Sequence, residues 1–501
     1  MNFFKMEKNK SISSIKKIIK DAHYYALAKL ILGFLGFLAV VIYTRLLNPK
    51  EYGLYILAIT AISIITSMCF EWLNKSILRF FEKYKQNQCL PKFISTVTYS
   101  LIGIVIIVLV LWYLGVNFFR NHLDSDLVIL LNIGGLVILT QAGYTLVLSL
   151  RQVAQESSKY AIRSILNAIV KLTIAICFLC FFRIGPKGIL LGMVISAGSI
   201  FIWDIFSLYH KYQVKACCFS KKLLKNLLAY GLPLIGLSVG SYILAAADRY
   251  MIEYFLTTDD VGIYSAGYNL SSTIIQLPIV ILLLAAYPVI VETFEKEKEK
   301  ETILLLNKII AIYFIFLVPI IFGIAVLSKN ITAILLGKGF QRSYIILPWI
   351  SIGVFCFGLI QYLYKPFELK QKTKILSLLA ICAAVINIVL NLFFIPKFGT
   401  LGAAYTTLIS YVTYLFSTWF LSRKIFAWSF PWQTIVRTFL ASTGMYLILH
   451  FIVSIHPVSK VFLIIDILIG IACYFSTLLI LKEKITIQGF RYAFQLLKAR
   501  K

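Results

Sequence analysis

Three basic residues lie within long apolar stretches of this chain. Lys171 follows Tyr160 by eleven residues, which places it about 16 Å along a helix that rises 1.5 Å per residue. Arg163, Asn167 and Lys171 repeat every fourth residue and so share one helix face. Lys29 lies in a similar stretch near the N-terminus. In the middle of a bilayer a charged side chain costs at least about 2.5–3.5 kcal/mol, so it normally faces a cavity and has a function.

The composition shows that these residues must be positioned by membrane-spanning helices. Of 501 residues, 60% are apolar and 14% are charged, whereas soluble proteins average about 45–50% and about 25%. The mean hydropathy is +0.87. These values exclude a soluble enzyme, a disordered chain and a collagen. Long uninterrupted apolar runs also exclude an outer-membrane barrel, whose strands alternate polar and apolar residues. The predicted fold class is an all-α polytopic membrane protein.

Fourteen segments are apolar over the roughly 20 residues that a spanning helix needs. They begin near Tyr24, Tyr52, Phe93, Leu127, Tyr160, Gly188, Leu227, Val261, Ile303, Tyr344, Thr373, Leu401, Thr434 and Lys460. The net charge is +28, and most lysines and arginines fall in alternate connections. Because cytoplasmic loops are enriched in basic residues, both termini are predicted to be cytoplasmic and no nucleic-acid partner is expected. The nine cysteines show no metal-binding or disulfide spacing, so neither a metal nor a cofactor is expected.

An internal repeat divides the chain. The segments RIGPKGILLGMVIS (Arg183–Ser196) and IPKFGTLGAAYTTLIS (Ile395–Ser410) both contain G-x-x-G, with a serine eight residues after the second glycine. Six spans per repeat give the two halves the same orientation, and such halves are related by a pseudo-two-fold axis along the membrane normal. We therefore predict six-helix bundles over residues 1–215 and 225–425, two further helices over 433–482, and a basic cytoplasmic tail over 483–501.

The chain resembles the polysaccharide transporter family, which comprises the O-antigen and capsule repeat-unit flippases. This family is part of the multidrug/oligosaccharidyl-lipid/polysaccharide exporter superfamily. The resemblance rests on TRLLNPKEYGLY, AADRYMIEYFLTTDDVGIYSAGYNL, ILLGKGFQRSYIILPWI and IPKFGTLGAAYTTLIS, in this order. It implies a fold like that of the multidrug and toxin exporters and a flippase of the bacterial cytoplasmic membrane. The implied substrate is a polyprenyl-diphosphate-linked oligosaccharide, carried from the inner to the outer leaflet by alternating access.

The buried polar residues then receive three predicted roles. Cations in the spans or at their outer ends are expected to bind the diphosphate: Lys29, Arg163, Lys171, Arg45 and Arg249. Polar and aromatic stripes are expected to contact the glycan through Gln141, Thr145, Tyr264, Tyr268 and Gln276. Acidic residues in or beside the spans are candidates for coupling to H⁺ or Na⁺, namely Asp204, Asp248 and Asp466. The alternatives are structural: interfacial snorkelling of basic side chains, ion pairs, and hydrogen bonds between helices.

Other functions remain open at this point. A lipid II-type flippase has the same requirements. A multidrug or cation antiporter needs a carboxylate-rich cavity, which the basic bias of the spans disfavours. A membrane glycosyltransferase or polymerase needs catalytic acids or bases in sizeable outer loops, and the connections here are short. Gly337, Lys338 and Gly339 lack the flanking residues of a phosphate-binding loop, so ATP is not the expected energy source. We expect a transporter surrounded by membrane lipids, with a glycan polymerase as a partner, rather than an enzyme.

Overall fold

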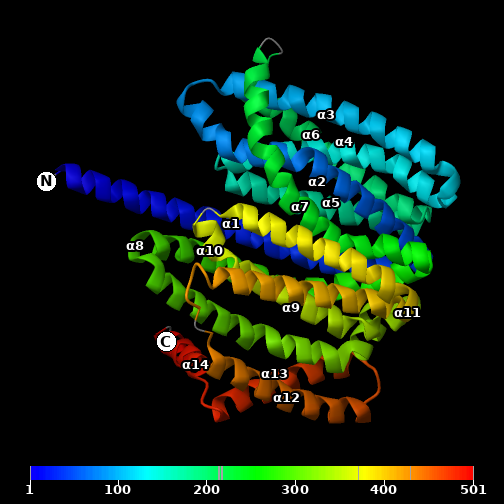
Figure 1. Cartoon of the computed structure of the whole chain (residues 1–501), viewed down its shortest axis with the longest axis vertical. Coiled ribbons are helices and arrows are strands. Elements are labelled where there is room, and N and C mark those ends of the chain that lie inside the picture. Colours follow the sequence, from blue (N-terminus) through cyan, green and yellow to red (C-terminus); the bar gives the residue numbers. More distant parts are fainter. Residues whose placement is uncertain (1, 213–214, 216–217, 371, 429, 500–501) are drawn as a thin grey trace. The chain divides into compact units, whose positions relative to one another are not determined.

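The computed structural model describes residues 2–499 apart from 213–214, 216–217, 371 and 429. The chain divides into an N-terminal unit, Met1–Tyr250, and a C-terminal unit, Met251–Lys501. The N-terminal range contains α1 (Asn2–Leu46), α2 (Pro49–Gln86), α3 (Leu90–Phe119), η1 (Arg120–His122), α4 (Ser125–Val153), α5 (Ser157–Cys177), η2 (Phe178–Phe182), α6 (Pro186–Tyr212) and most of α7 (Lys221–Phe255) (Figure 1). The division into bundles at 1–215 and 225–425 stays a prediction.

The described secondary structure of the C-terminal unit is also helical, with short turns between the helices. It contains α8 (Thr258–Leu335), η4 (Lys338–Ile345), α9 (Leu347–Leu363), α10 (Lys365–Leu369), α11 (Thr373–Ser422), α12 (Trp432–Ile455), α13 (Lys460–Ile480) and α14 (Lys484–Ala499). The charged run Glu292–Glu301 lies inside α8.

Twelve segments of the described chain are long and apolar enough to cross a membrane. One of them, Lys374–Ser422, includes the non-helical residue Gly399 and covers the predicted spans eleven and twelve. The predicted seventh span corresponds to α7, which is not among the twelve. The protein is therefore an all-α polytopic membrane protein, and its helices are consistent with the fourteen predicted spans.

In the N-terminal unit, α4 is the central helix. It packs against α2, α3, α5 and α6, while α1 lies along α5. Its buried face includes Val137, Ile138 and Val147, all fully enclosed. The hydrophobic effect does not drive helix association in a bilayer, so close van der Waals packing and hydrogen bonds between helices must do so. One such hydrogen bond runs from Ser76 Oγ on α2 to the carbonyl of Leu227 on α7, at 2.9 Å.

In the C-terminal unit, α8 contacts η4, α9, α12 and α13. The two helices beyond the repeat are held to α8 by a cluster of buried side chains, namely Ile315, Ala441, Met445, Leu449, Tyr474 and Leu478. The hydroxyl of Tyr474 donates to the carbonyl of Ile315 at 2.7 Å. Helices α12 and α13 are thus an integral part of this unit.

The motif TRLLNPKEYGLY contains the end of α1, a two-residue turn and the start of α2. Asn48 Oδ1 accepts a hydrogen bond from the backbone of Glu51 at 2.9 Å, and Glu51 Oε2 accepts one from the backbone of Asn48 at 3.0 Å. Pro49 occupies the first helical turn, where its missing N–H costs nothing. This reciprocal capping box ends the α1–α2 turn after only two residues.

The first glycine of each G-x-x-G segment has a positive backbone φ. Gly185 and Gly399, with φ of 61° and 60°, are the glycines of the described chain that have positive φ. A side chain at either position would be strained, since this region suits only glycine. The second glycine of each motif allows a close approach: a Cβ at Gly188 would lie 2.6 Å from Phe178, and one at Gly402 would lie 2.3 Å from the carbonyl of Phe394. These matching turns support the predicted internal repeat.

Candidate functional site

A polar pocket opens inside the N-terminal unit among α2, α4, α6 and α7. Its volume is about 420 Å³, and its polar lining consists of Ser63, Thr66, Ser67, Glu71, Asn74, Gln141, Thr145 and Tyr242. Two predicted glycan contacts, Gln141 and Thr145, therefore lie on a real cavity. The Thr145 hydroxyl donates to the carbonyl of Gln141 at 2.9 Å, which leaves its oxygen able to accept a hydrogen bond from a ligand.

The polar side chains that α2 contributes were missed by the sequence analysis. Ser63, Ser67 and Glu71 recur every fourth residue and form one stripe on α2, which is the signal that could have identified them. Glu71 lies 3.5 Å from Lys75 and keeps 29% of its side chain exposed. Asn74 accepts a hydrogen bond from Ser149 of α4 at 3.1 Å. The stripe gives the pocket a carboxylate and an amide beside its hydroxyl groups.

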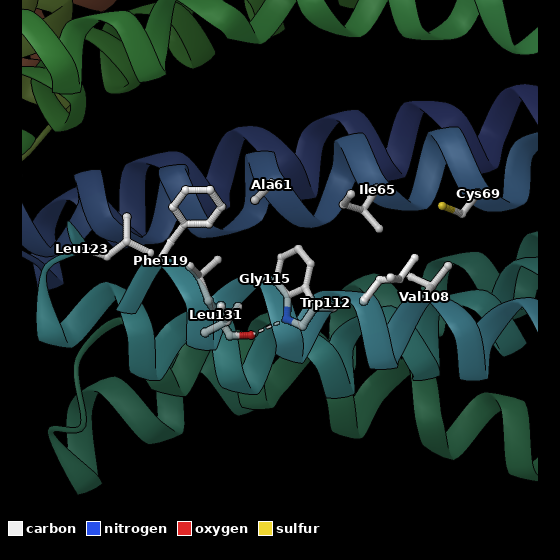
Figure 2. Close-up of a pocket in the computed structure, with 11 residues that line it drawn as sticks. Ala61, Ile65, Cys69, Val108, Trp112, Gly115, Phe119, Leu123 and Leu131 are labelled. Atoms are coloured by element: carbon white, nitrogen blue, oxygen red, sulfur yellow. Dashed lines mark hydrogen bonds between the residues drawn. The ribbon is translucent and has the colours of Figure 1, made fainter. Parts of the chain in front are cut away.

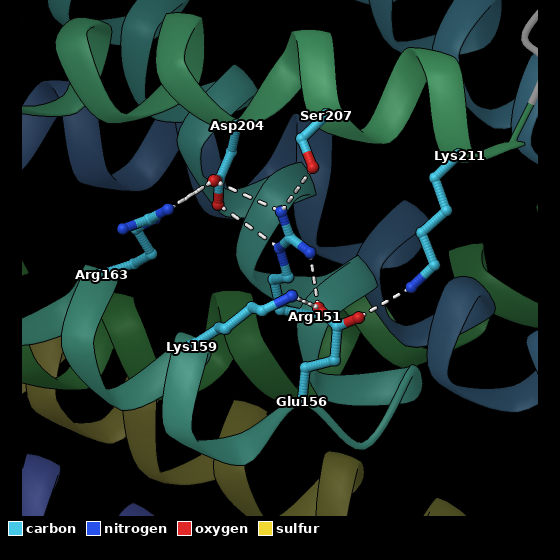
Figure 3. A network of polar contacts seen from close by, with 7 residues as sticks. All are labelled: Arg151, Glu156, Lys159, Arg163, Asp204, Ser207 and Lys211. Atoms are coloured by element: carbon cyan, nitrogen blue, oxygen red, sulfur yellow. Dashed lines mark hydrogen bonds and ion pairs between the residues drawn. The ribbon is translucent and has the colours of Figure 1, made fainter.

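An ion network joins α4, α5 and α6 (Figure 3). Asp204, which is 1% exposed, accepts hydrogen bonds from Arg163 Nη2 at 2.9 Å and Nε at 3.1 Å. Arg151 lies 3.3 Å from Asp204 and also pairs with Glu156. Asp204 is therefore bound by two guanidinium groups. Its placement matches the structural alternative to ion coupling.

Arg163 is also committed to this network. Its guanidinium carbon lies 3.8 Å from the centre of the Trp203 ring, a cation–π arrangement. Its charge is thus shared with Asp204, so it does not stand alone as a diphosphate ligand. Figure 3 shows Lys159 and Lys211 reaching Glu156 from opposite sides, with N···O distances of 3.5 Å and 2.7 Å. Counting all members, the network holds four cations and two carboxylates, so it retains positive charge.

Glu156 lies in the turn between α4 and α5. Burial opposes ionisation of its carboxyl, but hydrogen bonds from Lys211 and Arg151 outweigh burial and lower its pKa to about 2. A carboxyl with a lowered folded-state pKa stabilises the fold above its unfolded pKa of about 4.3, and the effect is lost as pH falls toward the folded value.

We expect the thermal midpoint of the wild-type protein to fall between about pH 4.5 and pH 2 by more than that of Glu156→Gln. The reason is that the variant has already lost the carboxylate that binds the extra proton in the unfolded state. Thermal unfolding of both purified proteins across this range measures the difference. If the thermal midpoints of the two proteins fell in parallel with pH, the charge of Glu156 would not contribute to the stability of the fold.

Lys171 lies half-buried on α5, two turns beyond Arg163. Within the described part of the chain, no carboxylate lies within 4 Å of its ammonium group. Tyr25 on α1 contacts Tyr160 on α5, with ring centres 5.0 Å apart. Because α1 and α5 are predicted to run parallel, Lys29 lies level with Arg163, and Lys171 lies about 12 Å beyond Arg163 along α5. Lys29 is exposed. The structure thus separates Lys171 from the ion network and leaves its charge available.

The cations and carboxylate predicted at the outer helix ends differ in burial. Arg45 is exposed, whereas Arg249 is 9% exposed and donates from Nη1 to the carbonyl of Ala245 at 3.1 Å. Asp248 is buried and accepts a hydrogen bond from the backbone of Arg249 at 2.9 Å. Both Arg249 and Asp248 are thus engaged within the protein. Their predicted roles in substrate binding and coupling stay predictions.

Two of the three glycan contacts predicted on α8 are core residues. Tyr264 is fully buried and Tyr268 is 7% exposed, with ring centres 6.0 Å apart. Helices η4 and α9 pack against α8, and Ser271 of the same helix bonds to the carbonyl of Leu347 on α9. Little ring surface is left for a sugar, so the packing alternative describes these tyrosines. Gln276 is exposed.

Asp466, the third predicted coupling residue, is fully buried on α13. Neither of its carboxyl oxygens has a hydrogen-bond partner within the described chain. A buried polar group without a partner is costly. This placement distinguishes Asp466 from Asp204 and keeps it as a candidate for proton binding.

A buried cation also lies just after α9, at the position of the C-terminal unit that corresponds to Arg151 of α4. Lys365, at the start of α10, is 3% exposed and lies 2.6 Å from Glu368. The rings of Tyr287 and Tyr364 lie 4.7 Å and 4.8 Å from its ammonium group. Lys365 follows Arg151 by 214 positions, the same offset that separates Gly185 from Gly399. Each unit therefore carries a buried cation that is paired with a nearby carboxylate at this position of the repeat.

Sequence comparison relates residues 18–294, more than half of the chain, to the family described as polysaccharide biosynthesis protein. An uncharacterized membrane protein of Methanocaldococcus jannaschii is 23% identical over 452 residues, which cover 82% of this chain and 85% of that protein. A protein of Shigella flexneri that carries the name O-antigen transporter is 23% identical over 411 residues, which cover 78% of this chain and 94% of its own length.

Among solved structures, the lipid II flippase MurJ in an inward closed conformation superimposes with a TM-score of 0.74. The match covers 90% of this chain and 97% of that chain at 17% sequence identity. At this level of identity the likeness establishes the fold.

Proposed function

The chain belongs to the polysaccharide biosynthesis protein family, and we propose that it is a flippase for a lipid-linked oligosaccharide. The proposed substrate is a polyprenyl-diphosphate-linked O-antigen or capsule repeat unit, moved from the inner to the outer leaflet of the cytoplasmic membrane by alternating access. The Shigella flexneri relative that is named for O-antigen transport supports this substrate class.

The polar pocket of the N-terminal unit is the observation that carries the proposal. A membrane-spanning bundle has no structural need for a hollow of about 420 Å³ lined by hydroxyl, amide and carboxylate groups. Polar residues within spans normally mark a substrate pathway. A sugar offers many hydroxyl groups that donate and accept hydrogen bonds, and Gln141, Thr145 and Asn74 offer both functions in return.

Lys171 supports the diphosphate part of the substrate. An anion that crosses a low-dielectric region needs a compensating charge. Arg151 and Arg163 are both paired with Asp204, whereas the ammonium of Lys171 has no carboxylate within 4 Å in the described part of the chain. We therefore assign the main diphosphate contact to Lys171, with Lys29 as a second cation nearer the predicted cytoplasmic end. H⁺ or Na⁺ coupling remains part of the proposal, and Asp466 is the favoured coupling residue.

The proposal is tested by transport in proteoliposomes. Purified protein is reconstituted with a fluorescent polyprenyl-diphosphate oligosaccharide, and a membrane-impermeant glycosidase reports how much substrate reaches the other leaflet. We expect protein-dependent transfer of this lipid, and faster transfer than for lipid II supplied in the same way. Transfer of lipid II alone would assign the protein to the lipid II-type alternative, and no transfer of either lipid would contradict a flippase.

We expect Gln141→Leu to slow this transfer by about 3–10-fold. The variant removes a donor and an acceptor that face the pocket, and a net hydrogen bond contributes about 0.5–1.5 kcal/mol. Thr140→Val is the matched control, since Thr140 does not line the pocket and its hydroxyl donates to the carbonyl of Leu136 in its own helix. Equal rates for the two variants would show that the pocket does not contact the moving substrate.

A further inference from the structure

A second hollow in the N-terminal unit is almost wholly apolar. It lies among α2, α3 and the start of α4 (Figure 2) and has a volume of about 390 Å³. Its lining consists of Ala61, Ile65, Cys69, Val108, Leu111, Trp112, Gly115, Val116, Phe119, Leu123 and Leu131. The polar pocket among α2, α4, α6 and α7, described above, shares none of these residues. The packed faces of α2 and α4 separate the two hollows.

The apolar pocket opens on the outer face of α3. Two lining residues, Leu111 and Phe119, are 63% and 56% exposed, and they form its rim. Ile107 and Leu114, which neighbour them on the same helix face, are exposed to a similar extent. Helix α3 contacts mainly α2 and α4. Because α3 spans the membrane, this exposed apolar surface faces hydrocarbon rather than water.

The pocket is long enough for a hydrocarbon chain. Its α3 lining runs from Val108 to Phe119, which is about 16 Å along the helix. Its volume is about two and a half times the roughly 150 Å³ of an engineered apolar cavity that binds benzene. The wall is fixed by Trp112, whose ring N–H donates to the carbonyl of Leu131 at 2.8 Å. Gly115 leaves the centre open, since a Cβ there would meet nothing within 4 Å.

A polar hollow adjoins the apolar one at the end of α3. It has a volume of about 510 Å³, shares Val116 and Leu123 with the apolar pocket, and is lined by Asn117, Arg120, Asn121, Ser125 and Asn132 among others. Arg120 directly follows the rim residue Phe119. A guanidinium beside amide groups suits a phosphate. The two adjoining hollows thus match the two parts of one amphipathic molecule.

We propose that this site holds a resident phospholipid of the surrounding membrane. One acyl chain occupies the apolar pocket, and the phosphate lies beside Arg120. The transported lipid does not fit this role. If its glycan were bound in the polar pocket lined by Gln141 and Thr145, the α2–α4 contact would separate that glycan from a hydrocarbon tail in the apolar pocket. The bound phospholipid fills the gap beside α3 and holds this helix against α2 and α4.

The test compares two glycine variants of the same helix by native mass spectrometry. Purified, delipidated full-length protein is titrated with phosphatidylglycerol. Gly115→Leu fills the apolar pocket, whereas Gly103→Leu places the same side chain on α3 outside it; at both positions a Cβ meets nothing within 4 Å. We expect Gly115→Leu to weaken binding of the tightest phosphatidylglycerol at least about tenfold, and Gly103→Leu to leave it unchanged.

The phosphate contact has its own variant. Arg120→Gln is expected to weaken the same binding several-fold while the protein keeps its wild-type thermal midpoint in lipid-free detergent. Added phosphatidylglycerol should raise that midpoint for the wild type and for Gly103→Leu but not for Gly115→Leu, since a ligand of the folded state stabilises it. Equal binding by both glycine variants would overturn the proposal. So would displacement of the phosphatidylglycerol by polyprenyl phosphate at lower concentration. Neither result depends on transport activity.

Discussion

Lys171→Ala is expected to reduce transfer of the lipid-linked oligosaccharide by at least about 100-fold. The ammonium of Lys171 is the available charge of α5, and the variant leaves the diphosphate without its partner inside the membrane. Removing one member of a buried charge pair costs about 3–5 kcal/mol, and each 1.4 kcal/mol is a factor of ten. The measurement is the leaflet-transfer assay at equal protein in the vesicles, together with surface glycan in cells.

Two further variants show whether that loss comes from the charge of Lys171. Lys171→Arg keeps the charge and should retain part of the activity, although the guanidinium differs in shape and hydration. Lys159→Ala removes an exposed lysine of the same helix, whose pairing with Glu156 at 3.5 Å is solvent-exposed, and should transport normally. Wild-type transfer by Lys171→Ala would refute the assigned diphosphate contact.

Asp204→Asn is expected to cost about 3–5 kcal/mol of stability. The aspartate is buried and pairs with both Arg151 and Arg163, so the variant leaves two guanidinium groups without a shared counter-ion. Its side chain is the same size, so the loss reports the charge rather than the packing. Denaturation of the purified protein in detergent measures the effect.

A surface pair provides the control for Asp204→Asn. Asp126 lies 3.9 Å from Lys187, and both side chains are substantially exposed. Exposed pairs contribute about 0–1 kcal/mol, so Asp126→Asn should be close to wild type. If Asp204→Asn were equally mild, the network would be structurally dispensable, and Asp204 would regain its place as a candidate for ion coupling.

Much of the fold could be predicted from the sequence because membrane spans and glycine turns leave local signals. The apolar runs located the helices, and the spacing Gly185–Gly188 and Gly399–Gly402 identified two turns whose first glycines both have positive φ. Such signals depend on a few neighbouring residues. They do not depend on which helices pack together.

The candidate site was harder to predict because it depends on helix rotation. Arg163 lies 41 positions before Asp204, and only the packing of α5 on α6 reveals that they pair. The tyrosines of α8 have the spacing of a binding stripe, but the same spacing suits burial, and η4 and α9 cover that face. Glu71 was not predicted because one carboxylate at the end of a serine stripe also suits a helix surface, and only the packing of α2 on α4 places it at a pocket.

The left-handed glycines at Gly185 and Gly399 also bear on motion during transport. Each lies in a tight turn, and α5 packs along α6, so we expect α5 and α6 to move as a pair. Bending has to occur elsewhere. Helix α8 is suited to this because Pro278, Pro288 and Pro319 interrupt its hydrogen bonding, and sharp helix bends occur at such residues. In the proposed alternating-access cycle, helix pairs that move as units about α8 would let the two membrane faces open in turn while both glycine turns keep their conformation.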